Sequence, residues 1–296
     1  MIIDLSVLTD GFSSKLRVIS FYLAVIKIKK YKKKIYIYEK KTKDSPYLFT
    51  DLCLIKDFKI IKLKKKPNNE IKFTPYNYDT ELEKLKKKNS INFNDKKFYS
   101  ISDKLYKNFI PIKKIQKKIK KLNLPKNFIG IHIRSTDREI KIINFLFNIQ
   151  FKEMIFDFQI KHMIENLLSF VKSKTKIKIF FITSDNKYYK DKIYNKLKKK
   201  VKIYSNNSKY EVKSFRQTSG EDFLIELFCL SKSKIIISTL GGAVPKTASM
   251  ISKNKINIYK WTNVLNFNII FKYLILIIFN LKKIKSNLLN HLLNRR

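Results

Sequence analysis

The sequence predicts an α/β fold with parallel strands, and three of its features support that prediction. Short runs rich in isoleucine, valine and aromatic residues alternate with longer stretches that have helical periodicity. Residues 128–133 (FIGIHI) are almost continuously apolar, as expected of a strand covered on both faces. Within residues 153–172, apolar side chains recur at helical spacing: Ile160, Met163, Ile164, Leu167, Leu168 and Val171. Such alternation is typical of a doubly wound parallel sheet.

In the first half of the chain, strands are predicted at residues 1–8, 34–39 and 58–63. Ser13 or Ser14 can cap a helix that runs to about residue 28, and Ser45-Pro46 is expected to open a short helix through Leu54. This order indicates parallel pairing. Residues 64–120 show few clean periods, so we expect loops, short helices and a linker there, ending in a basic helix at 113–121.

The second half is more regular, with strands predicted at residues 128–133, 177–183, 201–204, 234–238 and 256–259. Helices are predicted at 153–172, 187–199 and 219–230, and a last one begins near Pro245. Ser219 is the expected N-cap of its helix, and Pro245 suits a first turn because its missing N–H has no partner there. We therefore divide the chain into units at 1–115 and 116–262 and a helical tail at 263–296.

The formal net charge of +42 over 296 residues has two explanations. One is attraction to an anionic partner, either nucleic acid or acidic lipid. The other is a gene rich in A and T, since the chain holds 59 Lys but only 6 Arg and is rich in Asn and Ile. Phosphate recognition would rely more on Arg, whose planar fork matches phosphate oxygens. We favour the compositional explanation and do not expect nucleic acid as a partner.

Two cysteines, Cys53 and Cys229, cannot form a disulfide framework, and residues 1–8 lack the pattern of a signal peptide. A cytoplasmic protein is the default expectation. Residues 265–281 contain an apolar run, IIFKYLILIIF, which is short for a membrane span. A buried or bridging helix is favoured there. An interfacial helix that makes the protein peripheral to the inner membrane is the first alternative, and a true span is the second.

Polar residues follow three of the predicted strands, and ligands of open α/β sheets bind beyond such strand ends. His132 and Arg134 should share one face, where they could hold a pyrophosphate together, and Asp137 could orient Arg134. The alternative is a core histidine beside a surface Asp–Arg pair. After the next strand, Thr183 and Asp185 could contact a ribose or base, although Ser, Asp and Asn there could equally cap a helix.

The third strand end is a loop of small residues that enters the Pro245 helix. Its backbone amides and the helix dipole could bind phosphate, and a simple tight turn is the alternative. The loop contributes these candidates: Ser238, Thr239, Gly241, Gly242 and Ala243. Where Lys is the default cation, a retained Arg can mark a need for bidentate geometry, which adds Arg17 and Arg216 to the donor-site candidates, together with Gly11.

No metal-binding pattern is present, because the three histidines are far apart and an Asp-x-Asp of the sugar-nucleotide type is lacking. GxGxxG and Walker motifs are absent too. The charge of a diphosphate would then have to be met by Arg, Lys and backbone dipoles, with no metal and no further cofactor.

Four segments, in order, resemble the motifs of the fucosyltransferase superfamily, which includes α1,6-fucosyltransferases, nodulation fucosyltransferases and protein O-fucosyltransferases. They are DGFSSKLR at 10–17, HIRSTD at 132–137, FFITSDN at 180–186 and EDFLIELFCLSKSKIIISTLGGAVPKTAS at 221–249. The first resembles a G-x-G-N-x-L-R loop, the second an H-x-R-x-x-D motif and the third a strand ending in T-D-N. The resemblance covers residues 1–60 and 120–260.

The resemblance implies a GT-B fold, in which two Rossmann-like domains with parallel sheets face a cleft. It implies inverting, metal-independent transfer of fucose from GDP-fucose to a hydroxyl of a glycan or glycolipid. Arg134 would grip the β-phosphate, His132 would assist at the nucleotide, Asp185 would contact ribose or guanine, and the 239–243 loop would bind phosphate. The 1–115 unit would lie on the acceptor side.

The sequence departs from the family at two places. Ser13 and Ser14 stand where the family has Gly and Asn, and Gly242 and Ala243 stand where serines are usual. Transfer from another nucleotide sugar is therefore one alternative, and a basic protein that binds nucleic acid or a membrane surface on a Rossmann-like fold is another. Spacing does not choose a general base between Asp137 and Glu139.

Overall fold

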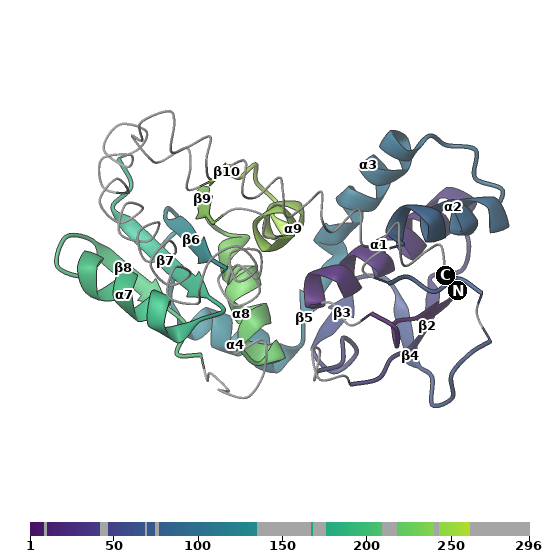
Figure 1. Ribbon diagram of the computed structural model, residues 1–296, viewed down its shortest axis with the longest axis horizontal. Coiled ribbons are helices and arrows are strands. Elements are labelled where there is room, and N and C mark those ends of the chain that lie inside the picture. The colour runs from purple at the N-terminus through teal and green to yellow at the C-terminus, as the bar shows by residue number, and fades with distance from the viewer. Residues whose placement is uncertain are drawn as a thin grey trace, which may run out of the picture.

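The computed structural model of the chain describes residues 1–8, 11–41, 47–68, 70–74, 77–134, 167, 176–208, 218–239 and 243–260. These residues form two α/β halves that lie side by side, each built on its own parallel sheet (Figure 1). The fold class predicted from the sequence is thereby confirmed. The division at 115/116 stays a prediction, because that boundary falls inside a helix, α4 (Lys113–Lys121).

The first sheet has three parallel strands in the order β1-β2-β4. These are β1 (Ile2–Asp4), β2 (Lys34–Tyr38) and β4 (Lys59–Lys62). Helix α1 (Phe12–Lys29) connects β1 to β2, and twelve of its eighteen residues are buried, so it forms the centre of the first half. The strands predicted at 34–39 and 58–63 and the first predicted helix are confirmed with small changes at their ends. The strand predicted at 1–8 is confirmed only over Ile2–Asp4, since residues 5–8 form a turn.

The short helix predicted at 45–54 is wrong over the residues that the structure describes. Residues 47–52 form turns, and β3 (Cys53–Ile55) pairs antiparallel with β5 (Phe109–Pro111). The carboxylate of Glu39 accepts the amide protons of Phe49 and Thr50, at 2.8 and 2.9 Å, so these amides have no need of a helical partner. Cys53 and Ile55 are buried while Leu54 is half exposed, which is the alternation of a strand.

The region without clean periods contains short elements that pack beside α1: α2 (Tyr78–Lys88), α3 (Asp95–Leu105) and the 3₁₀ turn η1 (Tyr106–Asn108). Asn94 caps α3 by accepting the amide proton of Lys97. The following helix α4 has the predicted bounds, because Ile115 and Ile119 are its buried residues and lie one turn apart.

The second sheet has five parallel strands in the order β10-β9-β6-β7-β8. They are β6 (Ile129–Ile133), β7 (Ile179–Ser184), β8 (Lys202–Ser205), β9 (Ile235–Ser238) and β10 (Asn257–Lys260). Strand β6 is central and entirely buried, and β7 and β9 flank it. All five predicted strands are confirmed.

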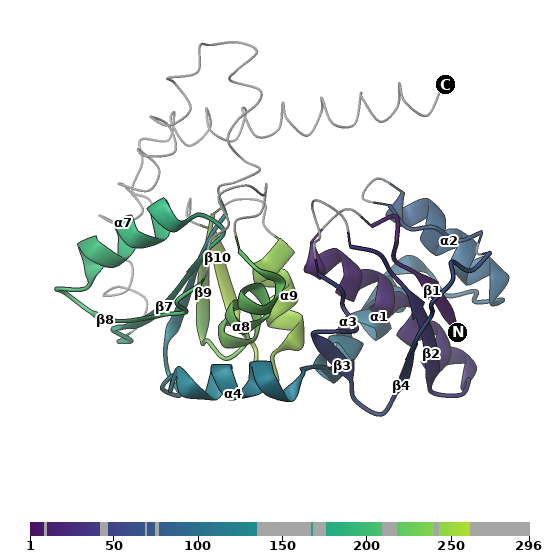
Figure 2. The same ribbon diagram turned by 90° about the horizontal axis from the view of Figure 1, so that it is seen from below.

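Helices cover both faces of this sheet (Figure 2): α7 (Lys187–Leu197) lies on one side, and α8 (Gly220–Leu230) and α9 (Ala243–Ile251) lie on the other, toward the first half. Ser219 caps α8 by accepting the amide proton of Asp222 at 3.1 Å, as predicted, and Pro245 lies in the first turn of α9. Gly130 of β6 lets α8 pack closely, because an added Cβ there would lie 2.6 Å from Cδ2 of Leu230.

The apolar side chains follow this layering. Ile129, Ile131 and Ile133 share a core with α7, whereas Phe128 and Phe181 belong to a larger core that includes α8, α9 and the whole interior of the first half. The two halves are therefore joined by one continuous hydrophobic core. Because side chains alternate along a strand, His132 and Arg134 face the side of α8 and α9, toward the seam between the halves.

The helix predicted at 153–172 and the tail at 263–296, with its 265–281 segment, lie outside the described residues, apart from Leu167, which is helical and buried. No helix within the described ranges is both long and apolar enough to cross a bilayer.

Candidate functional site

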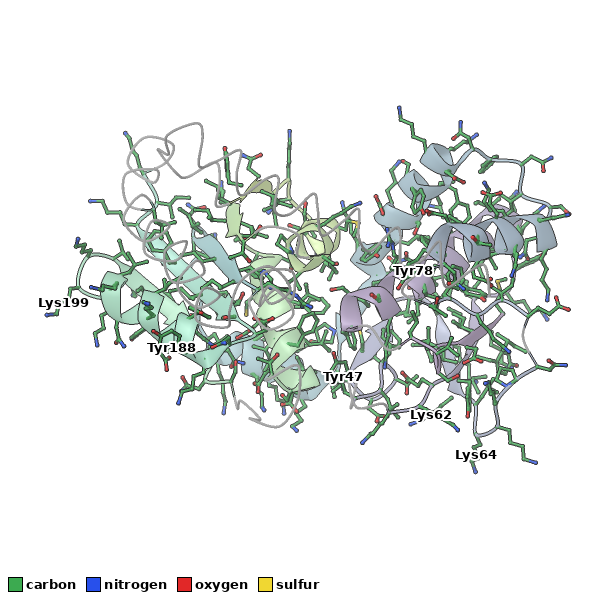
Figure 3. All side chains as sticks on the ribbon, in the orientation of Figure 1. Tyr47, Lys62, Lys64, Tyr78, Tyr188 and Lys199 are labelled. Atoms are coloured by element: carbon green, nitrogen blue, oxygen red, sulfur yellow. The ribbon has the colours of Figure 1, made fainter. Side chains whose placement is uncertain are left out.

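A cavity of about 230 Å³ lies at the seam, where strands β6 and β7 end and helices α1 and α9 begin. We call it the donor cavity, after the donor-site residues that the sequence predicts at these strand ends. The first half contributes the residues that begin α1 and Tyr47, which lies at the junction of the two halves (Figure 3). The second half contributes the ends of its central strands and one side of α8. This is the position at which parallel α/β sheets bind ligands.

His132 and Arg134 both line the cavity, as their alternation along β6 predicts. The side chain of Arg134 is 20% exposed, so its guanidinium is largely shielded from bulk water but still reachable by a ligand. His132 is buried between its register partners Thr183 on β7 and Ser238 on β9. Charge interactions are strengthened in such a partly desolvated position.

Thr239 fixes the backbone of Arg134 from the next strand. Its hydroxyl oxygen accepts the Arg134 amide proton at 2.9 Å, and its own N–H donates to the His132 carbonyl at 3.1 Å. Residue 134 therefore lies against the start of the 239–243 loop, as a shared phosphate site requires. Thr239 itself is buried behind the cavity and does not line it.

Asp185 follows β7 and lies beside Arg134. Its Oδ2 is 4.0 Å from Nε of Arg134, and its amide donates to the carbonyl of Ile133 at 3.4 Å. The carboxylate, 12% exposed, can hold the guanidinium in the cavity and still accept a hydrogen bond from a ligand hydroxyl. Asn186, not Asp185, is the N-cap of α7, which removes the simple capping explanation for the acid.

Two helices begin at the cavity. Gly11 is the N-cap of α1, and Ala243 is the first residue of α9; both line the cavity wall. The unpaired amides and the dipole of a helix N-terminus favour an anion, and such a site is strengthened by a nearby guanidinium.

Glu226 of α8 also lines the cavity, although sequence patterns did not single it out. Its Oε1 accepts hydrogen bonds from Lys190 Nζ at 3.1 Å and Ser208 Oγ at 2.9 Å. The two charged side chains are only 6% and 8% exposed, and burial raises the pKa of Glu226 to about 7 despite Lys190. A single acid within the apolar run FLIELFCL, after the acidic first turn of the helix, is the sequence signal that could have identified it.

The structure brings most of the described candidates together. Those that line the donor cavity are Gly11, His132, Arg134, Thr183, Asp185 and Ala243. Ser238 and Thr239 lie directly behind it. Arg17 instead stands in a neighbouring hollow, with its guanidinium 4.8 Å from the ring centre of Tyr78. The remaining candidates lie outside the described residues: Asp137, Arg216, Gly241 and Gly242.

The sequence analysis also missed the residues that complete the cavity through packing. Tyr47 comes from a loop of the first half and presses on Gly220, where an added Cβ would lie 2.3 Å from its Cγ. Phe12 and Phe223 meet across the seam with ring centres 6.1 Å apart. Among the described residues, no three His, Cys, Asp or Glu side chains gather as metal ligands would.

Solved structures of similar architecture are fucosyltransferases. POFUT1 in complex with GDP-fucose matches with a TM-score of 0.50 at 10% identity, over 90% of this chain and 98% of that one. NodZ alpha-1,6-fucosyltransferase soaked with GDP-fucose matches with a TM-score of 0.48 at 12% identity, over 85% and 91%. No protein-family model matches the sequence, and no curated protein matches it either. The match to POFUT1 supports the GT-B fold that the motifs suggested for this chain.

Proposed function

We propose that this protein is a glycosyltransferase that moves fucose from GDP-fucose to a glycan hydroxyl, with inversion and without a metal ion. The observation that carries the proposal is the placement of Arg134. Its guanidinium lies beside Asp185 in a cavity between two halves of a GT-B fold, which the first residue of α9 also lines, and its backbone amide is held by Thr239. The structure of POFUT1, which matches this chain over 98% of its own length, was solved in complex with GDP-fucose.

In this reaction the oxygen of an acceptor hydroxyl forms a bond to the anomeric carbon as the bond from that carbon to the β-phosphate oxygen breaks. The bonding pair leaves with GDP, so negative charge grows on the β-phosphate. Arg134 and the first amides of α9 would neutralise it, since such groups act strongest on charge that develops in the transition state. Asp137 and Glu139 remain the proposed candidates for the base that takes the acceptor proton.

Glu226 supports guanine as the base of the donor. A carboxylate can accept two parallel hydrogen bonds from the N–H groups on the Watson–Crick edge of guanine, whereas uracil offers one such group. Among the described residues, the hydrogen bonds to Glu226 reach only Oε1. A donor with another base is the alternative within the same reaction class.

The first test is calorimetric titration of GDP into the full chain and three variants. Arg134→Ala should weaken GDP binding by about 10- to 100-fold, because a charge-assisted hydrogen bond contributes about 1.5–3 kcal/mol. Arg134→Lys should recover part of this loss, since it keeps the charge without the fork. Lys196→Ala, on the exposed face of α7, is the control and should bind GDP like the wild type.

GDP binding that is indifferent to Arg134→Ala would remove the basis of the proposal. Titration with UDP separates the donor alternatives, and a preference for UDP would replace fucose by another nucleotide sugar. Binding that depends steeply on salt and equally on every lysine tested would favour the rival class, a basic protein that binds nucleic acid or a membrane surface.

A further inference from the structure

Two more hollows continue from the donor cavity along the seam. The nearer, about 430 Å³, lies between α1, α3, η1 and α9 and shares Ser13, Ser14 and Ala243 with the donor cavity. The farther, about 690 Å³, lies between α3 and the connection from α9 to β10. It shares Tyr99, Asp103 and Met250 with the nearer one. We call the two hollows together the seam groove; an extended molecule in it would end at the donor cavity.

The nearer hollow has the chemistry of a sugar-binding surface. Its walls combine aromatic rings, hydroxyl groups and a few charges: Phe21, Tyr99, Tyr106, Ser13, Ser14, Thr247, Arg17, Lys246 and Asp103. Burial raises the pKa of Asp103, and the charges of Lys246 and Arg17 act against that shift, so the acid and both cations influence one another here. Apolar surface with a few placed polar groups is typical of small-ligand sites.

The farther hollow is strongly cationic. Five of its twelve lining residues are lysines, three from α3 and η1 and two from the connection after α9: Lys96, Lys104, Lys107, Lys253 and Lys255. Asp103 is the one acid in its lining. The salt bridges within the described part of the chain involve other lysines, and five lysines face one carboxylate in this lining, so the described lining is positive on balance. A hollow lined by one sign of charge concentrates ions of the opposite sign.

Lysine is abundant in this chain, so lysines alone would prove little. What distinguishes the seam groove is that lysines from two separate elements converge on one hollow, and that this hollow adjoins the nearer, hydroxyl-rich hollow, which in turn adjoins the donor cavity through shared lining residues. A solvated lysine-rich face such as that of α7 has neither property. The same contrast supplies a matched control.

We propose that the seam groove is the acceptor site and that the acceptor is an anionic glycan, carrying carboxylate or phosphate groups. Its charged sugars lie among the lysines after α3 and α9, and the sugar to be modified passes Tyr99 and Tyr106 to reach Ser13 and Ser14. Calling the ligand an acceptor rests on the proposed function. The preference of the groove for anions can be measured independently of that function.

The test is fluorescence anisotropy with the full chain and three labelled probes at an ionic strength of about 0.15 M, where the screening length is about 8 Å. The probes are hexagalacturonate, neutral maltohexaose and a single-stranded hexanucleotide. The groove variant is Lys104→Glu/Lys253→Glu, and the control is Lys196→Glu/Lys199→Glu, which changes the net charge equally. Lys196 is an exposed residue in the last turn of α7, and Lys199, just after the helix, lies remote from the seam (Figure 3). A neutralising pair, Lys107→Gln/Lys255→Gln, repeats the test with a milder change.

We expect hexagalacturonate to bind the wild type at least tenfold more tightly than maltohexaose. The groove variant should weaken it by about tenfold, equal to about 1.4 kcal/mol, and the control by less than about threefold. Equal losses in both variants, or equal binding of the neutral probe, would overturn the proposal. So would tighter groove-dependent binding of the hexanucleotide, which would assign the groove to nucleic acid.

Titration of GDP into the same variants separates the two proposals. GDP affinity should be unchanged in the groove variant, because its lysines do not line the donor cavity. If the wild type does not bind GDP but still prefers the anionic probe, the proposed donor is wrong and the groove remains an anionic-glycan site. Intact GDP binding without the anion preference would defeat the groove alone.

Discussion

The buried pair of Glu226 and Lys190 predicts how the stability of the fold should change with pH. Burial raises the pKa of Glu226 from 4.5 in the unfolded chain to about 7 in the folded one. A group whose pKa is higher in the folded state favours folding below its unfolded pKa, and that contribution is lost as the pH rises through the folded pKa. The unfolding free energy should therefore fall between about pH 4.5 and 7, by at most about 3 kcal/mol, since each pKa unit is worth about 1.4 kcal/mol.

Glu226→Gln isolates this contribution. Gln resembles the protonated acid in shape and keeps an oxygen for Ser208, but it cannot ionise. Urea unfolding, followed by far-ultraviolet circular dichroism at pH 4.5, 5.5, 6.5 and 7.5, should show similar stability for both proteins at the lowest pH. By pH 7.5 the variant should be the more stable one. A constant difference across this range, or a gain by the wild type as the pH rises, would refute the reasoning.

Two further predictions concern contacts that hold the site. Gly220→Ala should lower the unfolding free energy by about 1–3 kcal/mol, because the added methyl group would overlap Tyr47. In thermal unfolding, the double variant Gly220→Ala/Tyr47→Ala should recover part of this loss. A single variant as stable as the wild type would contradict this packing. Thr239→Val should cost about 1–3 kcal/mol and weaken GDP binding, because the Arg134 amide loses its acceptor, whereas Thr239→Ser should behave like the wild type in both measurements.

The strand ends of the second half could be predicted from the sequence because topology alone brings them together. Once β6, β7 and β9 are parallel neighbours, the residues at their carboxyl ends must share one edge of the sheet. His132, Arg134 and Asp185 were found in this way. Helix α4 was predicted to the residue as a basic helix, and in the structure its buried side chains are two isoleucines one turn apart, Ile115 and Ile119.

Other features depend on contacts between distant segments and have no local signal. The carboxylate of Glu39 accepts hydrogen bonds from the amides of Phe49 and Thr50. These contacts stabilise a turn where the sequence predicted a helix. Helices α2 and α3 carry few apolar residues, so their helical periodicity in the sequence is weak. They are stabilised by packing in the same core as α1. Tyr47 and Glu226 reach the donor cavity only because the halves meet there.

The retained arginines show both the use and the limit of compositional reasoning. In a lysine-rich chain, Arg134 lines the donor cavity, where the proposed function places a diphosphate that a planar cation would suit. Arg17 is retained as well, but its guanidinium stacks on Tyr78 in the neighbouring hollow. A flat cation serves stacking as well as it serves phosphate. Sequence alone could not tell whether an arginine is retained for phosphate or for an aromatic ring. The structure separates the two, because the guanidinium of Arg17 lies over the ring of Tyr78.

The shared core between the halves predicts how the protein takes up its donor. Phe12 contacts Phe223 across the seam, and both side chains pack in the core that the two halves share. Opening the halves like a hinge would expose several large apolar side chains, each at a cost of about 1.5–3 kcal/mol. GDP should therefore bind without a change in the relative position of the halves. Small-angle X-ray scattering of the full chain should give the same radius of gyration with and without saturating GDP, and a contraction on binding would show that the seam opens in the free protein.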